Sequence, residues 1–124
     1  MESVVYRPLK AGASAVVELG NEVRGATSEE FRSVVRHLLS RGIYWIAMDF
    51  RSSWSADSMA IGVLLMAQKL CSEQGGAVFL LKPSKAILSL LQVLQVHNYF
   101  PVVEDEESIL ERIHQAKIKR ARIE

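Results

Sequence analysis

Apolar positions along the chain follow two alternating patterns. Short apolar runs predict five strands, at residues 4–6, 15–19, 44–50, 77–81 and 99–103. Longer segments with an apolar residue every three or four positions predict helices that begin near residues 27, 58, 84 and 104. The resulting order is ββαβαβαβα. This alternation is typical of an α/β fold, with a mixed, mostly parallel sheet of about five strands and covering helices.

Polar residues mark where the first two covering helices begin. Thr27 and Glu30 have the spacing of a capping box, which predicts that the Thr27 side chain caps the first helix. Asp57 and Ser58 follow the strand at 44–50 and stand directly before the second helix. A serine hydroxyl is therefore expected at a helix N-terminus, where backbone N–H groups and the dipole favour negative charge. Such a serine can be a cap, a nucleophile or a phosphate acceptor.

The helix that follows Asp57 is apolar on both sides. A helical wheel predicts this core face: Ala60, Val63, Leu64, Ala67, Leu70 and Cys71. The opposite side, with two methionines at its edge, consists of Ser58, Gly62, Leu65, Lys69, Met59 and Met66. Two interpretations carry equal weight: a neighbouring segment covers this side, or a partner protein docks on it.

Length and charge narrow the class of protein. The 124 residues predict a single domain over 1–116, followed by a basic tail over 117–124. A net charge of +1 argues against nucleic-acid binding as the main role. The single cysteine, Cys71, is expected to be a buried thiol and excludes an internal disulfide. With neither a signal peptide nor a membrane span in view, the prediction is a cytoplasmic protein, and no metal or cofactor is expected.

Catalysis by Ser58 would require a general base and an oxyanion site. The three histidines, His37, His97 and His114, have no recognisable catalytic setting. The sequence also lacks a G-x-S-x-G elbow around Ser58 and a glycine-rich phosphate loop. The chain is therefore predicted not to be an enzyme.

Several short motifs recur in the order of a known family. Over residues 4–112 the chain resembles the STAS domain, and more closely the free-standing bacterial anti-sigma factor antagonists. The motifs that carry the resemblance are Leu19-Gly20-Asn21-Glu22-Val23, Thr27, Ala47-Met48-Asp49-Phe50, Asp57-Ser58, Ile61-Gly62-Val63-Leu64-Leu65, Gly75-Gly76-Ala77 and Lys82-Pro83. Met59 and Ala60 stand where the family commonly has a second small residue and a glycine.

The resemblance implies a switch that works through a protein partner. It implies that an anti-sigma factor, an ATP-dependent serine kinase, phosphorylates Ser58, and that the unphosphorylated protein binds this kinase and frees the sigma factor. Asp57 matches the family's aspartate, and Asn21 and Glu22 match the loop that borders the site. The expected partner-binding residues are Asn21, Glu22, Asp57, Met59, Gly62, Leu65, Met66 and Lys69.

A second hypothesis is a constitutive accessory subunit of a lipid-transport or stressosome complex, which would bind its partner without phosphorylation. In either case the chain is expected to act by protein binding, without direct contact to nucleic acid, as a monomer or weak dimer.

Overall fold

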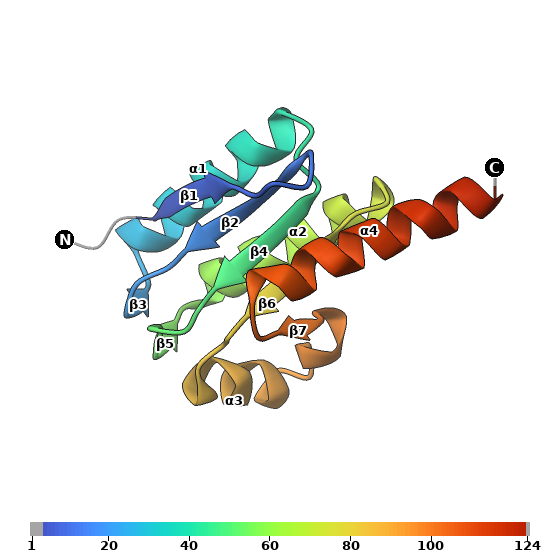
Figure 1. Cartoon of the computed structure of the whole chain (residues 1–124). Helices are drawn as coiled ribbons and strands as arrows, with labels where there is room; N and C mark the ends of the chain where they lie inside the picture. The colour runs from blue at the N-terminus through green and yellow to red at the C-terminus, as the bar shows by residue number, and fades with distance from the viewer. Residues whose placement is uncertain (1–3, 124) are drawn as a thin grey trace.

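The computed structural model describes residues 4–123 and is built around a five-stranded sheet (Figure 1). Its strands are β1 (Val5–Pro8), β2 (Ser14–Glu18), β4 (Trp45–Asp49), β6 (Ala77–Leu81) and β7 (Val102–Val103). They lie side by side in the order β1-β2-β4-β6-β7. Only β1 runs antiparallel to its neighbour. The predicted α/β fold with a mixed, mostly parallel sheet is confirmed.

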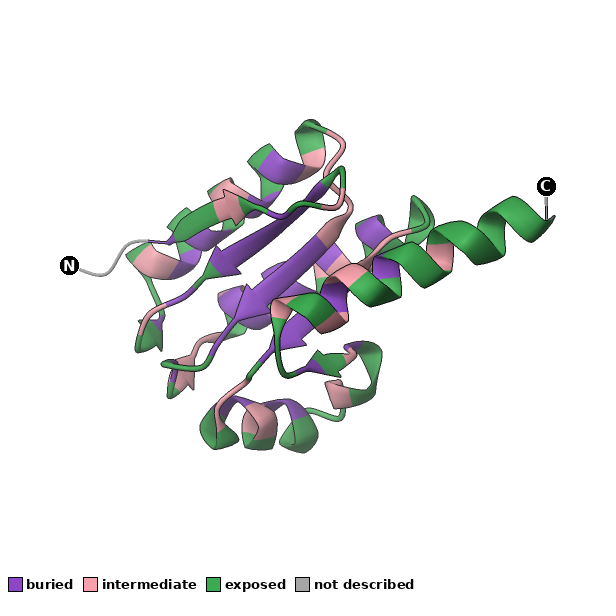
Figure 2. Cartoon of the chain, in the orientation of Figure 1, coloured by how far each residue is buried: buried purple, intermediate pink, exposed green. Residues whose placement is uncertain are grey.

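Helices cover both faces of this sheet. They are α1 (Ala26–Ser40), α2 (Ser58–Glu73), α3 (Lys85–Val93) and α4 (Glu106–Ile123). α1, α2 and α3 contribute to one apolar cluster, and α4 contributes to the other. Successive strand residues point to opposite faces: in β4, Ile46 and Met48 belong to the first cluster and Ala47 to the second. Figure 2 shows that the central strands of the sheet and parts of the helices that cover it are buried.

The α4 helix is held at both ends of its packed part. Arg7 of β1 donates hydrogen bonds to Glu106 at the first turn of α4, one of them 2.9 Å long. Ile109 and Ile113 are buried against the sheet. Beyond them α4 continues to Ile123, so the basic segment from residue 117 is the exposed end of a helix (Figure 1).

Two short strands were not predicted. β3 (Glu22–Val23) and β5 (Ser55–Ala56) pair in parallel as a separate two-stranded sheet. Each is too short to show a hydrophobic period, and β3 begins at Glu22, where the sequence pattern indicates that the preceding strand has ended. This small sheet, here called the β3–β5 ribbon, extends from the carboxyl ends of β2 and β4 (Figure 1).

The predicted cap of α1 is wrong. The N-cap position is Gly25, with no side-chain cap, and Thr27 already lies inside the helix. A tertiary contact acts at this helix start instead, because the N–H of Gly25 donates to the carboxylate of Asp57, which is distant in sequence.

Two further predictions are corrected by packing. Leu70 was expected in the core but is 38 % exposed, whereas Ile61 is buried. The last predicted strand is shorter than 99–103, since residues His97–Tyr99 form a 3₁₀ turn, η1, and only Val102–Val103 pair with β6. Pro101 has no N–H for a longer ladder.

Candidate functional site

The β3–β5 ribbon joins two loops that follow neighbouring strands. The N–H of Trp54 donates to the carbonyl of Asn21 over 2.8 Å, and the N–H of Asp57 donates to that of Val23 over 3.0 Å. The Ser53 hydroxyl also donates to the Gly20 carbonyl over 2.6 Å. Asn21 and Glu22 are thus brought beside the segment that leads into α2.

Asp57 is the central polar side chain of this site. Its Oδ1 accepts from the N–H of Ala60 at 3.0 Å and from the hydroxyl of Ser28 at 2.6 Å. Its Oδ2 accepts from the N–H of Gly25 at 2.9 Å. Asp57 therefore caps α2 and also links α2 to the start of α1. Sequence reasoning identified the cap but missed Ser28, which is buried and carries no motif of its own.

These contacts keep the Asp57 carboxylate ionised. Burial acts to raise its pKa, but hydrogen bonds from Ser28, Ala60 and Gly25 and the charge of Arg24 outweigh that effect, and the pKa is lowered. A negative charge therefore stands directly before Ser58.

Ser58 is the first residue of α2 and is exposed. Because Asp57 supplies the cap, the Ser58 hydroxyl is not needed for it. None of the three histidines lies on the segments that build this site: His37 is in the last turn of α1, His97 in η1 and His114 in α4. The site therefore presents an accessible hydroxyl at the start of α2, and the histidines lie on other segments.

The predicted docking side of α2 divides into two parts. Gly62, Leu65 and Lys69 are exposed, with Leu65 at 36 %. Met59 and Met66 are half-buried, and Met66 packs against the main core. The available surface is therefore a narrow strip along α2 that begins at Ser58, with its exposed residues spaced about one helical turn apart. Met66 contributes more to the core than predicted.

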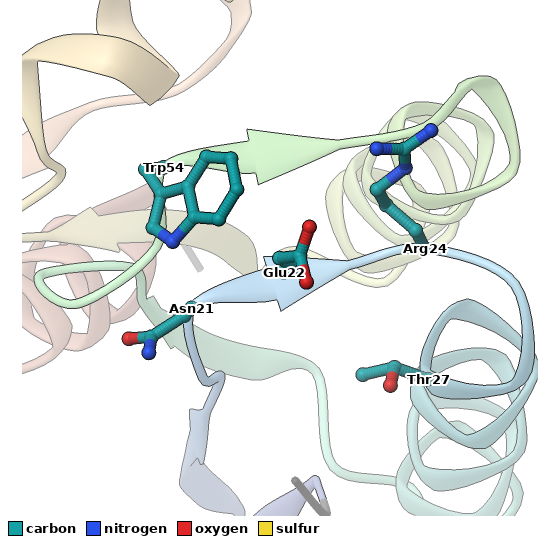
Figure 3. A pocket seen from close by; sticks show the side chains of 5 residues that line it. All are labelled: Asn21, Glu22, Arg24, Thr27 and Trp54. Carbon is teal, nitrogen blue, oxygen red and sulfur yellow. The ribbon is translucent and has the colours of Figure 1, made fainter.

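An open hollow of about 460 Å³ lies on the β3–β5 ribbon (Figure 3). It is lined by Asn21, Glu22, Arg24, Thr27 and Trp54. Trp54 is 59 % exposed and also borders a second hollow, of about 470 Å³, which reaches Leu90 and Val93 of α3. Arg24 was missed by sequence reasoning, since a lone arginine in a loop has no distinguishing pattern.

Two kinds of feature are absent from residues 4–123. No group of three or more histidine, cysteine, aspartate or glutamate side chains is arranged to hold a metal ion. None of the helices in this range has the length and apolarity needed to cross a bilayer.

The sheet order, the placement of the helices and the Asp57-capped start of α2 together define the class: a STAS-type α/β domain. A sequence model of the family described as "Mlab, STAS domain" matches residues 8–104. The chain belongs to this STAS family, and the predicted resemblance is confirmed. A search of curated protein sequences found no match.

Solved structures show the same fold at low identity. The anti-sigma factor antagonist SpoIIAA in its unphosphorylated form is 18 % identical, with a TM-score of 0.77 over 90 % of this chain and 96 % of that one. The Bacillus cell fate determinant SpoIIAA in the phosphorylated form is 20 % identical, with a TM-score of 0.71 over 89 % and 98 % of the two chains. A STAS domain protein from Planctomyces limnophilus is 17 % identical, with a TM-score of 0.72 over 89 % and 97 %.

Proposed function

We propose that this protein is an anti-sigma factor antagonist controlled by phosphorylation of Ser58. In the unphosphorylated state it binds an anti-sigma serine kinase in the cytoplasm and so releases a sigma factor. The kinase transfers the γ-phosphoryl group of ATP to Ser58 Oγ, ADP leaves, the hydroxyl proton is released, and the complex dissociates. The chain itself catalyses no reaction.

One observation carries the proposal: exposed Ser58, which does not cap the helix, is the first residue of α2. The same helix bears the exposed strip of Gly62, Leu65 and Lys69. A kinase docked on this strip would have Ser58 at the edge of the interface. Likeness to SpoIIAA structures named as unphosphorylated and phosphorylated forms supports the same interpretation.

Electrostatics explain how the modification would release the partner. A phosphoryl group adds about −1.5 to −2 charges at pH 7. It would stand next to ionised Asp57 at the edge of an apolar contact, where desolvation is costly. A loss of about 1.4 kcal/mol weakens binding tenfold, so modest repulsion suffices.

The test uses the purified chain, ATP and each candidate kinase. Mass spectrometry is expected to map the phosphate to Ser58, and phosphate on a different residue contradicts the proposal. Ser58→Asp should bind the kinase at least tenfold more weakly than Ser58→Ala. Ser33→Asp adds the same charge at an exposed position of α1 instead of α2, and it should bind as the unaltered protein does.

A constitutive accessory subunit is the second candidate. The description of the matching family names Mlab and no sigma factor, which favours keeping it. It predicts that Ser58→Ala and Ser58→Asp bind the partner equally and that the co-purifying protein is a transport ATPase.

A further inference from the structure

Arg24 is held beside the residue that precedes Ser58. The two residues flanking Arg24 both bind Asp57: Val23 accepts its N–H at 3.0 Å, and Gly25 donates to its Oδ2 at 2.9 Å. Val23 pairs with Ala56 in the parallel β3–β5 ribbon. The next residue of each segment therefore brings Arg24 opposite Asp57. Backbone hydrogen bonds, not a flexible loop, therefore place Arg24 at the start of α2.

The Arg24 side chain is exposed at this end of the ribbon. Figure 3 shows it at the opposite end of the hollow from Asn21 and Trp54, over the side where β5 leads toward α2. Its charge reaches the site, because it contributes to the lowered pKa of Asp57. Within residues 4–123, the ion pairs shorter than 4.0 Å are made by Arg7 and Arg51, and Arg24 is not among them.

Asp57 does not need Arg24 as a partner. Both of its oxygens already accept hydrogen bonds, from Ala60 and Ser28 on one side and from Gly25 on the other. Next to Arg24, a Cβ on Gly25 would meet no atom within 4 Å, so the space there is open. The Arg24 guanidinium is therefore exposed at the end of the ribbon that leads into α2, and it makes no ion pair shorter than 4.0 Å within residues 4–123.

Three acidic residues lie on the segments that build this site. Asp57 lies at the start of α2, Glu22 on β3, and Glu29 in the first turn of α1. A phosphoryl dianion placed among them would be repelled unless a cation offset the charge. Arginine matches a phosphate with two parallel N–H donors, as a lysine ammonium does not.

We propose that Arg24 is the intramolecular partner of the phosphoryl group on Ser58, pairing with it and holding it against the β3–β5 ribbon. This rests on the proposed function, because it assumes that Ser58 is the modified residue. Arg24 is a positioning residue for the phosphorylated state and takes no part in the phosphoryl transfer.

The test installs phosphoserine at position 58 during translation, so that no kinase is needed. The phosphate pKa is then measured by ³¹P NMR in the full chain. Arg24→Gln should raise this pKa by roughly 0.2 to 0.7 pH units, the shift equivalent to an exposed ion pair. Arg24→Lys should retain part of the lowering, and 1 M salt should diminish the difference between the variants.

Arg32→Gln is the matched control, because Arg32 is an exposed arginine of α1. It should leave the phosphate pKa unchanged. The pairing is overturned if Arg24→Gln titrates like the unaltered phosphoprotein, or if Arg32→Gln gives the same shift. Failure of every candidate kinase to modify Ser58 would instead count against the proposed function, and the NMR result would stand apart from it.

Discussion

The carboxylate of Asp57 accepts hydrogen bonds from three segments: the loop before α1, α1 itself and α2. A capping aspartate usually serves its own helix alone, as Asp105 does by binding the N–H and hydroxyl of Ser108. Asp57 therefore joins elements that are far apart in sequence, and its loss should affect more than one helix end.

We expect Asp57→Ala to lower the free energy of unfolding at pH 7 by about 1–3 kcal/mol, since it removes a cap and leaves Ser28 with one partner fewer. Because the folded pKa of Asp57 is lowered, its contribution is complete above the unfolded value of about 3.9 and is lost as pH falls through the folded value. Urea unfolding from pH 7 to 3 should show the gap to the unaltered protein closing.

Asp105→Ala is the control for this comparison. Both of its hydrogen bonds stay within the first turn of α4, so its loss at pH 7 should be smaller. A gap for Asp57→Ala that stays constant with pH, or does not exceed the Asp105→Ala loss, would show that the three-segment link contributes little.

At the scale of elements, two glycines have opposite roles. Gly62 lies on the exposed strip of α2, where an added Cβ would meet no atom within 4 Å. Gly76 lies between α2 and β6, and its Cβ would come within 1.8 Å of the Tyr44 carbonyl oxygen. A side chain at position 62 would therefore contact nothing within the fold, whereas the absence of one at Gly76 lets the backbone of Tyr44 approach closely.

The same substitution should therefore have opposite effects at the two positions. Gly62→Ala should stabilise the protein by about 0.5–1 kcal/mol because α2 gains helix propensity, and it should weaken kinase binding if the partner approaches closely. Gly76→Ala should destabilise by about 1–3 kcal/mol because the backbone must shift. Thermal unfolding measures the change in stability of both variants, and a binding assay measures the kinase affinity of Gly62→Ala.

Ser33→Ala on exposed α1 is the matched control for the binding measurement. If Gly62→Ala leaves kinase affinity as unchanged as Ser33→Ala does, the partner does not approach α2 closely at this point.

At the scale of the whole molecule, α4 is divided between packed and exposed halves. Ile109 and Ile113 are buried on the sheet, whereas residues 117–122 are exposed. The Lys117 and Arg120 side chains lie near the turns at Gly12 and Gly75, respectively. The domain boundary predicted at residue 116 stays a prediction, which a shortened chain can test.

A chain that ends at Ala116 should keep its fold, with a melting temperature within a few degrees of that of the full chain, since the removed side chains bury little apolar surface. Ile113→Ala, by contrast, should cost about 2–4 kcal/mol, because it leaves a cavity against the sheet. Circular dichroism on heating measures both. Unfolding of the shortened chain would mean that the basic segment belongs to the domain.

Local patterns in the sequence determined the element order, the sheet class, the Asp57 cap and the exposed serine, because period and capping depend on residues near one another. They failed where distant contacts decide: the cap of α1, the exposure of Leu70, the half-burial of Met66 and the β3–β5 ribbon. Only tertiary structure brings Arg24 beside Asp57, since the pairing of β3 with β5 joins segments that follow two different strands. The sequence thus determined which hydroxyl begins α2, and the fold decided which charges surround it.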